Sequence, residues 1–350
     1  MAFQWFKFRS KTMLGVDIGT AAIKVTEVGK EGGRWVLKNY GIIAIPDPVS
    51  LKDGFADDAI SAALKELIKK SNFSSKDCVA SIPSFNTFST VIELPYLSEK
   101  DIARAIPFEA KKYIPLPLQE VNLDWSILSV KDSTSSNVQY PSVEVFIAAV
   151  PKDTVERYRI IFNRVGLRLK ALELENAALI RALIGNDQSS IGVVNMGGRS
   201  TSIFVAYKGV VRLSRNYEVG GFEITQALAR SLKVSVDRAE SMKKKIGIEG
   251  NEGGTVLKAI NTELDRLIVE GERTIETFED QKKIKVEKII LTGGLGTMPG
   301  IHKYFESKLH YPVSVGDPFA RVIAPQGLSP VIKELTPTLS VSIGLAMREI

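Results

Sequence analysis

The chain has 350 residues, of which 44% are hydrophobic and 25% are charged, a balance typical of soluble globular proteins. A chain of this length exceeds what one hydrophobic core usually organises, so two lobes are expected. Its 46 basic and 40 acidic residues give a net charge of +6. Because they are interspersed along the chain, without a sustained basic block, they argue against a nucleic-acid-binding surface. With one cysteine, Cys78, and two histidines, an intramolecular disulfide and a Cys/His metal cluster are both excluded.

Nothing in the sequence predicts a membrane span or a signal peptide, since no apolar run is long enough to cross a bilayer. Together with the single cysteine, this predicts a cytoplasmic protein. The tail, residues 1–12, carries four aromatic residues among basic ones. It would either contact a membrane or a partner, or fray at the end of the chain.

The first lobe is expected to begin with a sheet. Residues 13–28 and 35–45 have the apolar pattern of strands joined by tight turns. Apolar residues three and four apart then predict an amphipathic helix over 57–70, which should pack on that sheet.

An inserted unit is predicted over residues 78–150. The segment 78–94 is rich in strand-forming residues, and Ser98 is placed to cap a following helix. The polar segment 131–139 is typical of an exposed loop between two strands.

The second half of the chain repeats the plan of the first. Helices are expected over 151–166 and 172–184, followed by a hairpin over 191–206 that resembles the hairpin at the front of the chain. Two related lobes facing each other would explain that repeat. The remaining expected elements are helices over 224–246 and 254–283, a strand over 288–292, a helix ending near His310 and a final helix over 339–349.

Three glycine-containing turns carry the chemistry. In the first, Gly19 and Thr20 would let a phosphate approach backbone N–H groups, with Asp17 holding Mg²⁺ through water and Lys24 reaching back to the phosphates. The second turn offers Gly197, Gly198 and Thr201 for the same role. The third turn follows a strand rich in β-branched residues and precedes a helix. Its glycines would let a flat ligand lie against bare backbone; they are Gly293, Gly294, Gly296 and Gly300.

In this order the three turns resemble the phosphate 1, phosphate 2 and adenosine motifs of the actin, sugar kinase and Hsp70 superfamily. Within it, the chain resembles the PilM family of type IV pilus assembly and its relative, the FtsA family of cell division. The resemblance to the PilM family lies mainly outside the nucleotide motifs, in VIELPYLSEKDIARAIPFEAKKYIPLPLQEVNLDW (91–125) and FIAAVPKDTVERYRIIFNRVGLRLKALELENAAL (146–179).

The resemblance implies an α/β, actin-like (ribonuclease H-like) two-lobe ATPase fold with an inserted FtsA-type subdomain. The expected divisions are a tail (1–12), subdomain 1A (13–77 and 151–190), the inserted subdomain 1C (78–150), subdomain 2A (191–222 and 286–336), subdomain 2B (223–285) and a C-terminal helix returning to 1A (337–350).

Carried over to this sequence, the family pattern implies ATP and Mg²⁺ as ligands. Asp17 matches the Mg²⁺-water partner, and Glu175 the acidic residue that orients the attacking water. Matching nucleotide contacts are Gly19, Thr20, Lys24, Gly197, Gly198, Thr201, Gly220, Gly221, Glu240, Lys243, Gly293, Gly294 and Met298.

One position departs from the family pattern. The second phosphate motif normally begins with an acidic residue, and this chain has Asn195 there. A neutral amide cannot hold Mg²⁺ or its waters with a full charge, so ATP would bind but hydrolysis is expected to be weak or absent.

The leading functional expectation is a cytoplasmic ATP-binding scaffold, recruited to the inner face of the cytoplasmic membrane by the N-terminal peptide of a PilN-like inner-membrane protein. The resemblance also allows pilus assembly ATPases and self-association as partners, and it extends to related type II secretion-like assemblies. Two alternatives remain: an FtsA-like filament-forming ATPase, against which the lack of an amphipathic segment after the last helix counts, and a small-molecule kinase, for which no acceptor base is apparent.

Overall fold

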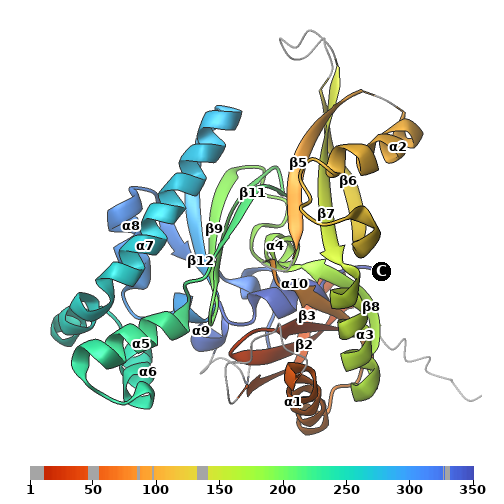
Figure 1. Ribbon diagram of the computed structural model, residues 1–350. Coiled ribbons are helices and arrows are strands. Elements are labelled where there is room, and N and C mark those ends of the chain that lie inside the picture. Colours follow the sequence, from red (N-terminus) through yellow and green to blue (C-terminus); the bar gives the residue numbers. More distant parts are fainter. Residues whose placement is uncertain are drawn as a thin grey trace, which may run out of the picture.

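The computed structural model describes residues 12–45, 55–84, 87–96, 98–131, 141–325, 327 and 332–350. The chain forms two lobes, each built on a mixed sheet, and a smaller third sheet that stands on the first lobe (Figure 1). Residues 1–11 of the expected tail and nearly all of the expected loop 131–139 lie outside the described residues.

The first lobe contains a six-stranded sheet in the order β14-β3-β2-β1-β4-β8. Strands β1, β2 and β3 run antiparallel as successive hairpins, and β4 and β8 continue the sheet parallel to β1. The strands are β1 (Met13–Ile18), β2 (Ala22–Glu31), β3 (Arg34–Ala44), β4 (Asp77–Ile82), β8 (Arg168–Leu174) and β14 (Val322–Ile323). Every residue of β1 is buried, because the strand is central and covered on both faces, which explains its loose alternation in the sequence.

The second lobe repeats this plan in a five-stranded sheet, β11-β10-β9-β12-β13. Again three antiparallel strands are followed by two parallel ones. The strands are β9 (Ser190–Met196), β10 (Thr201–Tyr207), β11 (Val210–Tyr217), β12 (Lys288–Thr292) and β13 (Val313–Val315). The shared order confirms the predicted duplication and the predicted ribonuclease H-like, actin-like fold class.

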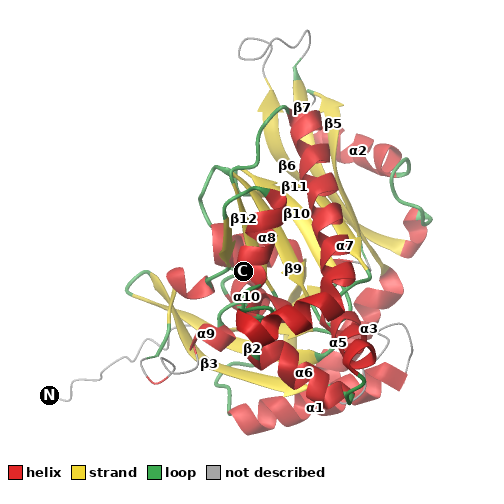
Figure 2. Cartoon of the chain, turned by 90° about the vertical axis from the view of Figure 1, so that its left-hand side faces the viewer, coloured by secondary structure: helices red, strands yellow, loops and turns green. Residues whose placement is uncertain are grey.

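Helices cover both sheets. In the first lobe, α1 (Phe55–Ser71) and α3 (Lys152–Val165) pack on each other, and α10 (Ser340–Ala346) packs against β1 and α4 (Glu175–Leu179). The second lobe is covered by the helices that face the viewer in Figure 2, namely α5 (Gly221–Leu232), α6 (Val236–Lys245), α7 (Gly250–Lys282) and α8 (Ile301–Leu309). A short helix, α9 (Ile332–Leu335), precedes α10.

The third sheet and one helix form a compact unit, which we call the insertion. Its strands β5 (Phe88–Pro95), β7 (Ser142–Pro151) and β6 (Val121–Lys131) lie in the order β5-β7-β6, and α2 (Glu99–Ala110) completes it. The predicted cap is present, because the Ser98 side chain accepts a hydrogen bond from the Asp101 backbone N–H.

Two expected subdomain boundaries differ from the sheet pairing. The segment 78–82 was expected in the insertion, but it forms β4 and pairs with β1 and β8 of the first sheet. The insertion therefore begins after Ile82. Likewise β14 was expected in the second lobe but pairs with β3 of the first.

The predicted helix over 172–184 is wrong at its start. Residues Leu172 to Leu174 complete β8 and pair with β4, so the helix begins at Glu175 and continues as a π-helical turn, Ile180–Ile184. The predicted helix over 224–246 is two helices, separated at Lys233, whose φ of 54° ends the first, while Ser235 caps the second.

Candidate functional site

The first turn lies between β1 and β2 and holds a buried ion pair. Asp17 and Lys24 are register partners on the two strands, and Lys24 Nζ lies 2.8 Å from Asp17 Oδ2. Asp17 is 4% exposed, and its other oxygen accepts a hydrogen bond from Ser81 Oγ at 3.1 Å. The sequence did not identify Ser81, because its place beside Asp17 depends on β4 pairing with β1.

The second turn, between β9 and β10, touches the first one. A Cβ atom at Gly198 would lie 2.9 Å from Ala21 Cβ and 3.0 Å from Thr20 Oγ1. Only glycine lets the two turns approach this closely without displacing a neighbour. The structure therefore brings the predicted phosphate-contact segments of the two lobes face to face.

The first backbone N–H groups of helix α5 are hydrogen-bonded to the second turn. The Gly221 N–H donates to the Gly197 carbonyl at 2.9 Å, and the Phe222 N–H donates to the Gly198 carbonyl at 2.7 Å. A Cβ atom at Gly220 would lie 2.7 Å from the Gly198 backbone. Gly220 and Gly221 thus serve the close packing of helix against turn.

Arg199, in the second turn, was not among the predicted residues. Its guanidinium carbon lies 5.1 Å from the centre of the Phe222 ring, a cation–π arrangement. Its Nε atom is buried and has no hydrogen-bond partner in the described part of the chain. A buried donor without an acceptor is costly, so this atom marks a place where an acceptor would be stabilising.

The third turn follows β12 and abuts the second. Strands β9 and β12 are parallel, which places Thr292 beside Asn195 at their carboxyl ends. Gly293 has a φ of 84°, and a Cβ atom there would lie 2.4 Å from the Met196 carbonyl oxygen. At Gly294, by contrast, a Cβ atom would meet nothing within 4 Å, which leaves the backbone bare.

Glu175 and Asn195 meet where the lobes adjoin. Asn195 Nδ2 donates to Glu175 Oε2 at 3.3 Å. Burial, with the charge of Asp17 as a second cause, raises the pKa of Glu175 to about 8, against the opposing effect of Lys24. At neutral pH the Glu175 carboxyl is therefore mostly protonated.

Two of the predicted nucleotide contacts, Glu240 and Lys243, form one hydrogen-bonded cluster beneath α5. Lys243 Nζ lies 2.6 Å from Glu240 Oε2, and it donates to the Gly221 carbonyl at 2.9 Å. Burial lowers the pKa of Lys243. Burial opposes ionisation of Glu240, but the bonds from Lys243 and Thr225 outweigh it and lower the pKa of that carboxyl.

Two predicted residues do not face the turns. Thr201 is fully buried, and its hydroxyl donates to the Val219 carbonyl at 2.6 Å. Met298 is buried in the core of the second lobe. Both side chains therefore support the fold behind the site.

The donor set has a limited capacity for metal ions. Within the described ranges, no group of three or more Cys, His, Asp or Glu side chains is placed to hold a metal ion. Mg²⁺ commonly takes one or two carboxylates and completes its shell with water and phosphate oxygens, so a single carboxylate such as Asp17 fits that mode.

A cavity of about 900 Å³ lies away from the three turns, between the first sheet and the insertion. Its walls come mainly from β6 and β7 of the insertion, from β8, and from the beginning of β11. The lining includes Leu128, Phe146, Lys170, Val211 and Arg321. Separately, no helix of the described residues is long and apolar enough to cross a membrane.

Comparisons with known proteins place this geometry in a family. The model of the family described as type IV pilus assembly protein PilM matches residues 15–350. A solved structure of a PilM-PilN type IV pilus biogenesis complex is 26% identical, with a TM-score of 0.82, and the match covers 96% of this chain and 98% of that one. MreB5 of Spiroplasma citri bound to AMPPNP is 12% identical, with a TM-score of 0.55 and coverage of 95% and 94%, and shares the fold.

Among curated proteins, the cell division protein FtsA of Neisseria meningitidis serogroup B is 28% identical over 286 residues, 71% of this chain and 66% of that protein. The match spans only 40% and 48% of the FtsA proteins of Bacillus subtilis and Pseudomonas aeruginosa. Proteins with the actin-like ATPase fold generally bind a nucleotide with Mg²⁺. The repeated sheets, the three apposed turns and the match over residues 15–350 together show that the chain belongs to the PilM family of type IV pilus assembly proteins.

Proposed function

We propose that this chain is an ATP-binding actin-like scaffold of type IV pilus assembly, which binds the cytoplasmic N-terminal segment of a PilN-like inner-membrane protein. The family match over residues 15–350 carries this proposal, supported by the likeness to a chain from a PilM-PilN complex. The protein would work in the cytoplasm and be held at the inner face of the membrane by that partner.

The three turns would hold the nucleotide. Lys24 would contact the phosphates as a point charge, and the bare backbone at Gly294 leaves room for a flat ring. Arg199 Nε, buried and without an acceptor, would be satisfied by a phosphate oxygen. Asp17 would hold waters of Mg²⁺, which neutralises phosphate charge when it is bound.

Hydrolysis would be slow because the two side chains expected to assist it, at positions 175 and 195, are both neutral. Asn195 replaces a carboxylate, and Glu175, with a pKa of about 8, is largely protonated at neutral pH and cannot accept a proton from water. Nucleotide would then act mainly as a ligand that sets the relative position of the lobes.

The cavity between the first sheet and the insertion suits an extended peptide. Strand β8 ends the order of the first sheet, so one side of it has no neighbouring strand among the described strands. A peptide could add to that edge through main-chain hydrogen bonds, while Leu128 and Phe146 receive apolar side chains. The lining has five basic side chains and two acidic ones, and four of the basic ones are paired with carboxylates of this chain; those four are Arg159, Lys170, Arg181 and Arg348.

A pull-down tests this function. The purified chain is mixed with a synthetic peptide of the cytoplasmic N-terminal residues of the PilN-like protein from the same genome, with and without Mg²⁺ and AMPPNP. Saturable binding of that peptide, and not of a scrambled one, is expected. Absence of binding in both nucleotide conditions would refute the partner assignment.

A further inference from the structure

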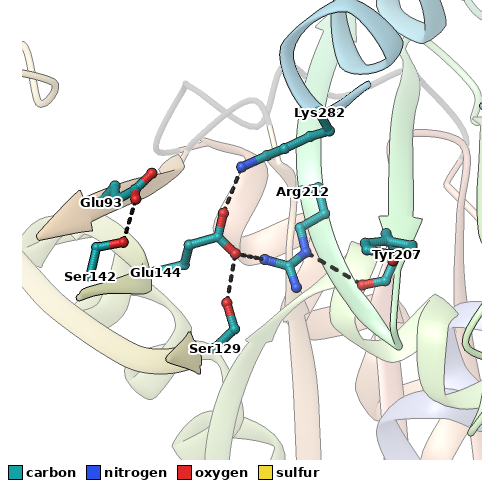
Figure 3. Close-up of polar contacts among 7 residues, drawn as sticks. All are labelled: Glu93, Ser129, Ser142, Glu144, Tyr207, Arg212 and Lys282. Carbon is teal, nitrogen blue, oxygen red and sulfur yellow. Dashed lines mark hydrogen bonds and ion pairs between the residues drawn. The ribbon is translucent and has the colours of Figure 1, made fainter. Parts of the chain in front are cut away.

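The insertion is joined to the second lobe by a buried carboxylate. Glu144, on β7, accepts hydrogen bonds from Arg212 Nη1 at 2.7 Å, from Lys282 Nζ at 2.6 Å and from Ser129 Oγ at 2.7 Å (Figure 3). Arg212 belongs to β11 and Lys282 to the end of α7, so two elements of the second lobe converge on one side chain of the insertion. We call these four residues the Glu144 cluster.

The ion pairs of this cluster are buried, which makes them costly to separate. The side chains of Glu144 and Arg212 are 7% and 5% exposed. Burial opposes ionisation of Glu144, but the bonds from Lys282 and Ser129 and the nearby cations outweigh it and lower its pKa to about 2. Arg212 Nε also donates to the Tyr207 carbonyl, which fixes the guanidinium. Separating the two sides would leave a buried charge without its partner, so the insertion is constrained to move with the second lobe.

The cluster adjoins the wall of the cavity. Ser129 follows Leu128, Arg212 follows Val211, and Glu144 lies two residues before Phe146 on the same strand; all three neighbours line the cavity. Strands β5 and β11 are also in contact, and they lie next to each other in Figure 1. A displacement of the cluster would therefore move the wall that the insertion contributes.

The cluster is also connected, through β11 and α7, to the second turn. Strand β11 pairs along its length with β10, which begins directly after the second turn. Helix α7 packs on α5, whose first N–H groups bond to the carbonyls of Gly197 and Gly198. Arg212 and Lys282 thus sit on elements that carry the second turn.

We propose that the Glu144 cluster couples nucleotide binding at the three turns to peptide binding in the cavity. Nucleotide binding would bring the two lobes closer together. Because Arg212 and Lys282 hold Glu144, the insertion would move with the second lobe. That movement would change the distance between β6 of the insertion and β8 of the first lobe, which line the cavity. This inference rests on the proposed function, because it regulates the proposed peptide site. Coupling between two binding sites is reciprocal, so the peptide alters nucleotide affinity by the same factor.

The test compares adjacent lysines at the end of α7. Lys282→Met removes a cluster contact, whereas Lys283→Met removes an exposed lysine whose ion pair, with Asp280, lies outside the cluster. Peptide dissociation constants are measured by titration calorimetry with and without Mg²⁺ and AMPPNP. We expect nucleotide to change the constant at least about fivefold in the wild type and in Lys283→Met, and less than twofold in Lys282→Met.

A second variant and a second readout keep the result decisive. Glu144→Gln should also reduce the nucleotide effect, and its circular dichroism spectrum checks that it folds. Hydrogen exchange of β6 and β7 needs no peptide: nucleotide should alter it in the wild type and in Lys283→Met but not in Lys282→Met. If the peptide does not bind, the proposed partner is wrong, while the exchange result still decides the coupling. An equal nucleotide effect in all variants, or none in the wild type, overturns the coupling.

Discussion

The side-chain amide of Asn195 donates to Glu175 Oε2 at 3.3 Å, across the junction of the two lobes. The amide meets a carboxyl that burial and the charge of Asp17 keep largely protonated. If an acidic residue stood in place of Asn195, two carboxyl groups would be in contact and would compete for one proton. A neutral residue at this position is therefore compatible with a neutral Glu175.

We expect Glu175→Gln to gain stability relative to the wild type as the pH rises from about 5 to about 8. Glutamate in the unfolded chain ionises near pH 4.3, whereas folded Glu175 ionises near 8, so the wild type loses ~1.4 kcal/mol per pH unit between these values. The glutamine variant has no such loss. Urea denaturation at pH 5, 6.5 and 8 measures the difference, with the exposed Glu156→Gln as the control. A stability difference independent of pH would contradict the raised pKa.

Asn195→Asp should raise ATP turnover by about tenfold, which corresponds to ~1.4 kcal/mol of transition-state stabilisation. The added carboxylate would supply the charge that metal-assisted phosphoryl transfer uses. Phosphate release is measured under saturating Mg²⁺ and ATP. Asn195→Ala, which removes the amide without adding charge, should show no rise. Equal turnover in the aspartate variant and the wild type would mean that Asn195 does not limit hydrolysis.

Lys24→Met should abolish the thermal stabilisation that Mg²⁺ and ATP give the wild type. A ligand at 100 times its dissociation constant stabilises a protein by ~2.7 kcal/mol, which raises the melting temperature by several degrees. Without the Lys24 ammonium the phosphates lose a charged partner. Lys30→Met, on the same strand but far more exposed, is the matched control and should keep the shift. A full shift in Lys24→Met would remove this lysine from the site.

Gly344→Ala should destabilise the first lobe by about 3 kcal/mol or more. A Cβ atom at Gly344 would lie 2.0 Å from the Ala178 carbonyl oxygen, so α10 and α4 would have to move apart. At Gly254, in α7, a Cβ atom would meet nothing within 4 Å, and Gly254→Ala should stabilise by ~0.5–1 kcal/mol through helix propensity. Thermal melts of both variants check the opposite signs, and similar melting temperatures would contradict the packing argument.

Phe146→Ala should weaken peptide binding by at least about tenfold, or ~1.4 kcal/mol, because an aromatic side chain lining a concave site commonly contributes a large share of the binding energy. The control is Tyr96→Ala, an exposed aromatic residue of the same unit that does not line the cavity. Fluorescence anisotropy of a labelled peptide measures both. If both variants bind as tightly as the wild type, the peptide occupies another surface.

Much of the fold could be predicted because its signals are local. The hairpins that lead to Asp17 and Asn195 combine strand-forming residues with small turn residues, and both signals act over a few neighbours. Their repetition was enough to predict two lobes of the same topology. The subdomain boundaries were harder. An apolar run such as Cys78 to Ile82 is the same in either sheet, and only its pairing with β1 and β8 decides where it belongs.

The sequence by itself determined the glycine turns and the departure at Asn195, since residue type fixes backbone freedom and charge. Only the tertiary structure decided which remote side chains meet. Ser81 reaches Asp17 from another strand, and Glu144 is 68 residues from Arg212 and 138 from Lys282. No local pattern records such pairs, because their distances are set by how the sheets and helices pack. Packing alone therefore brought the three separate turns together and linked the insertion to the second lobe.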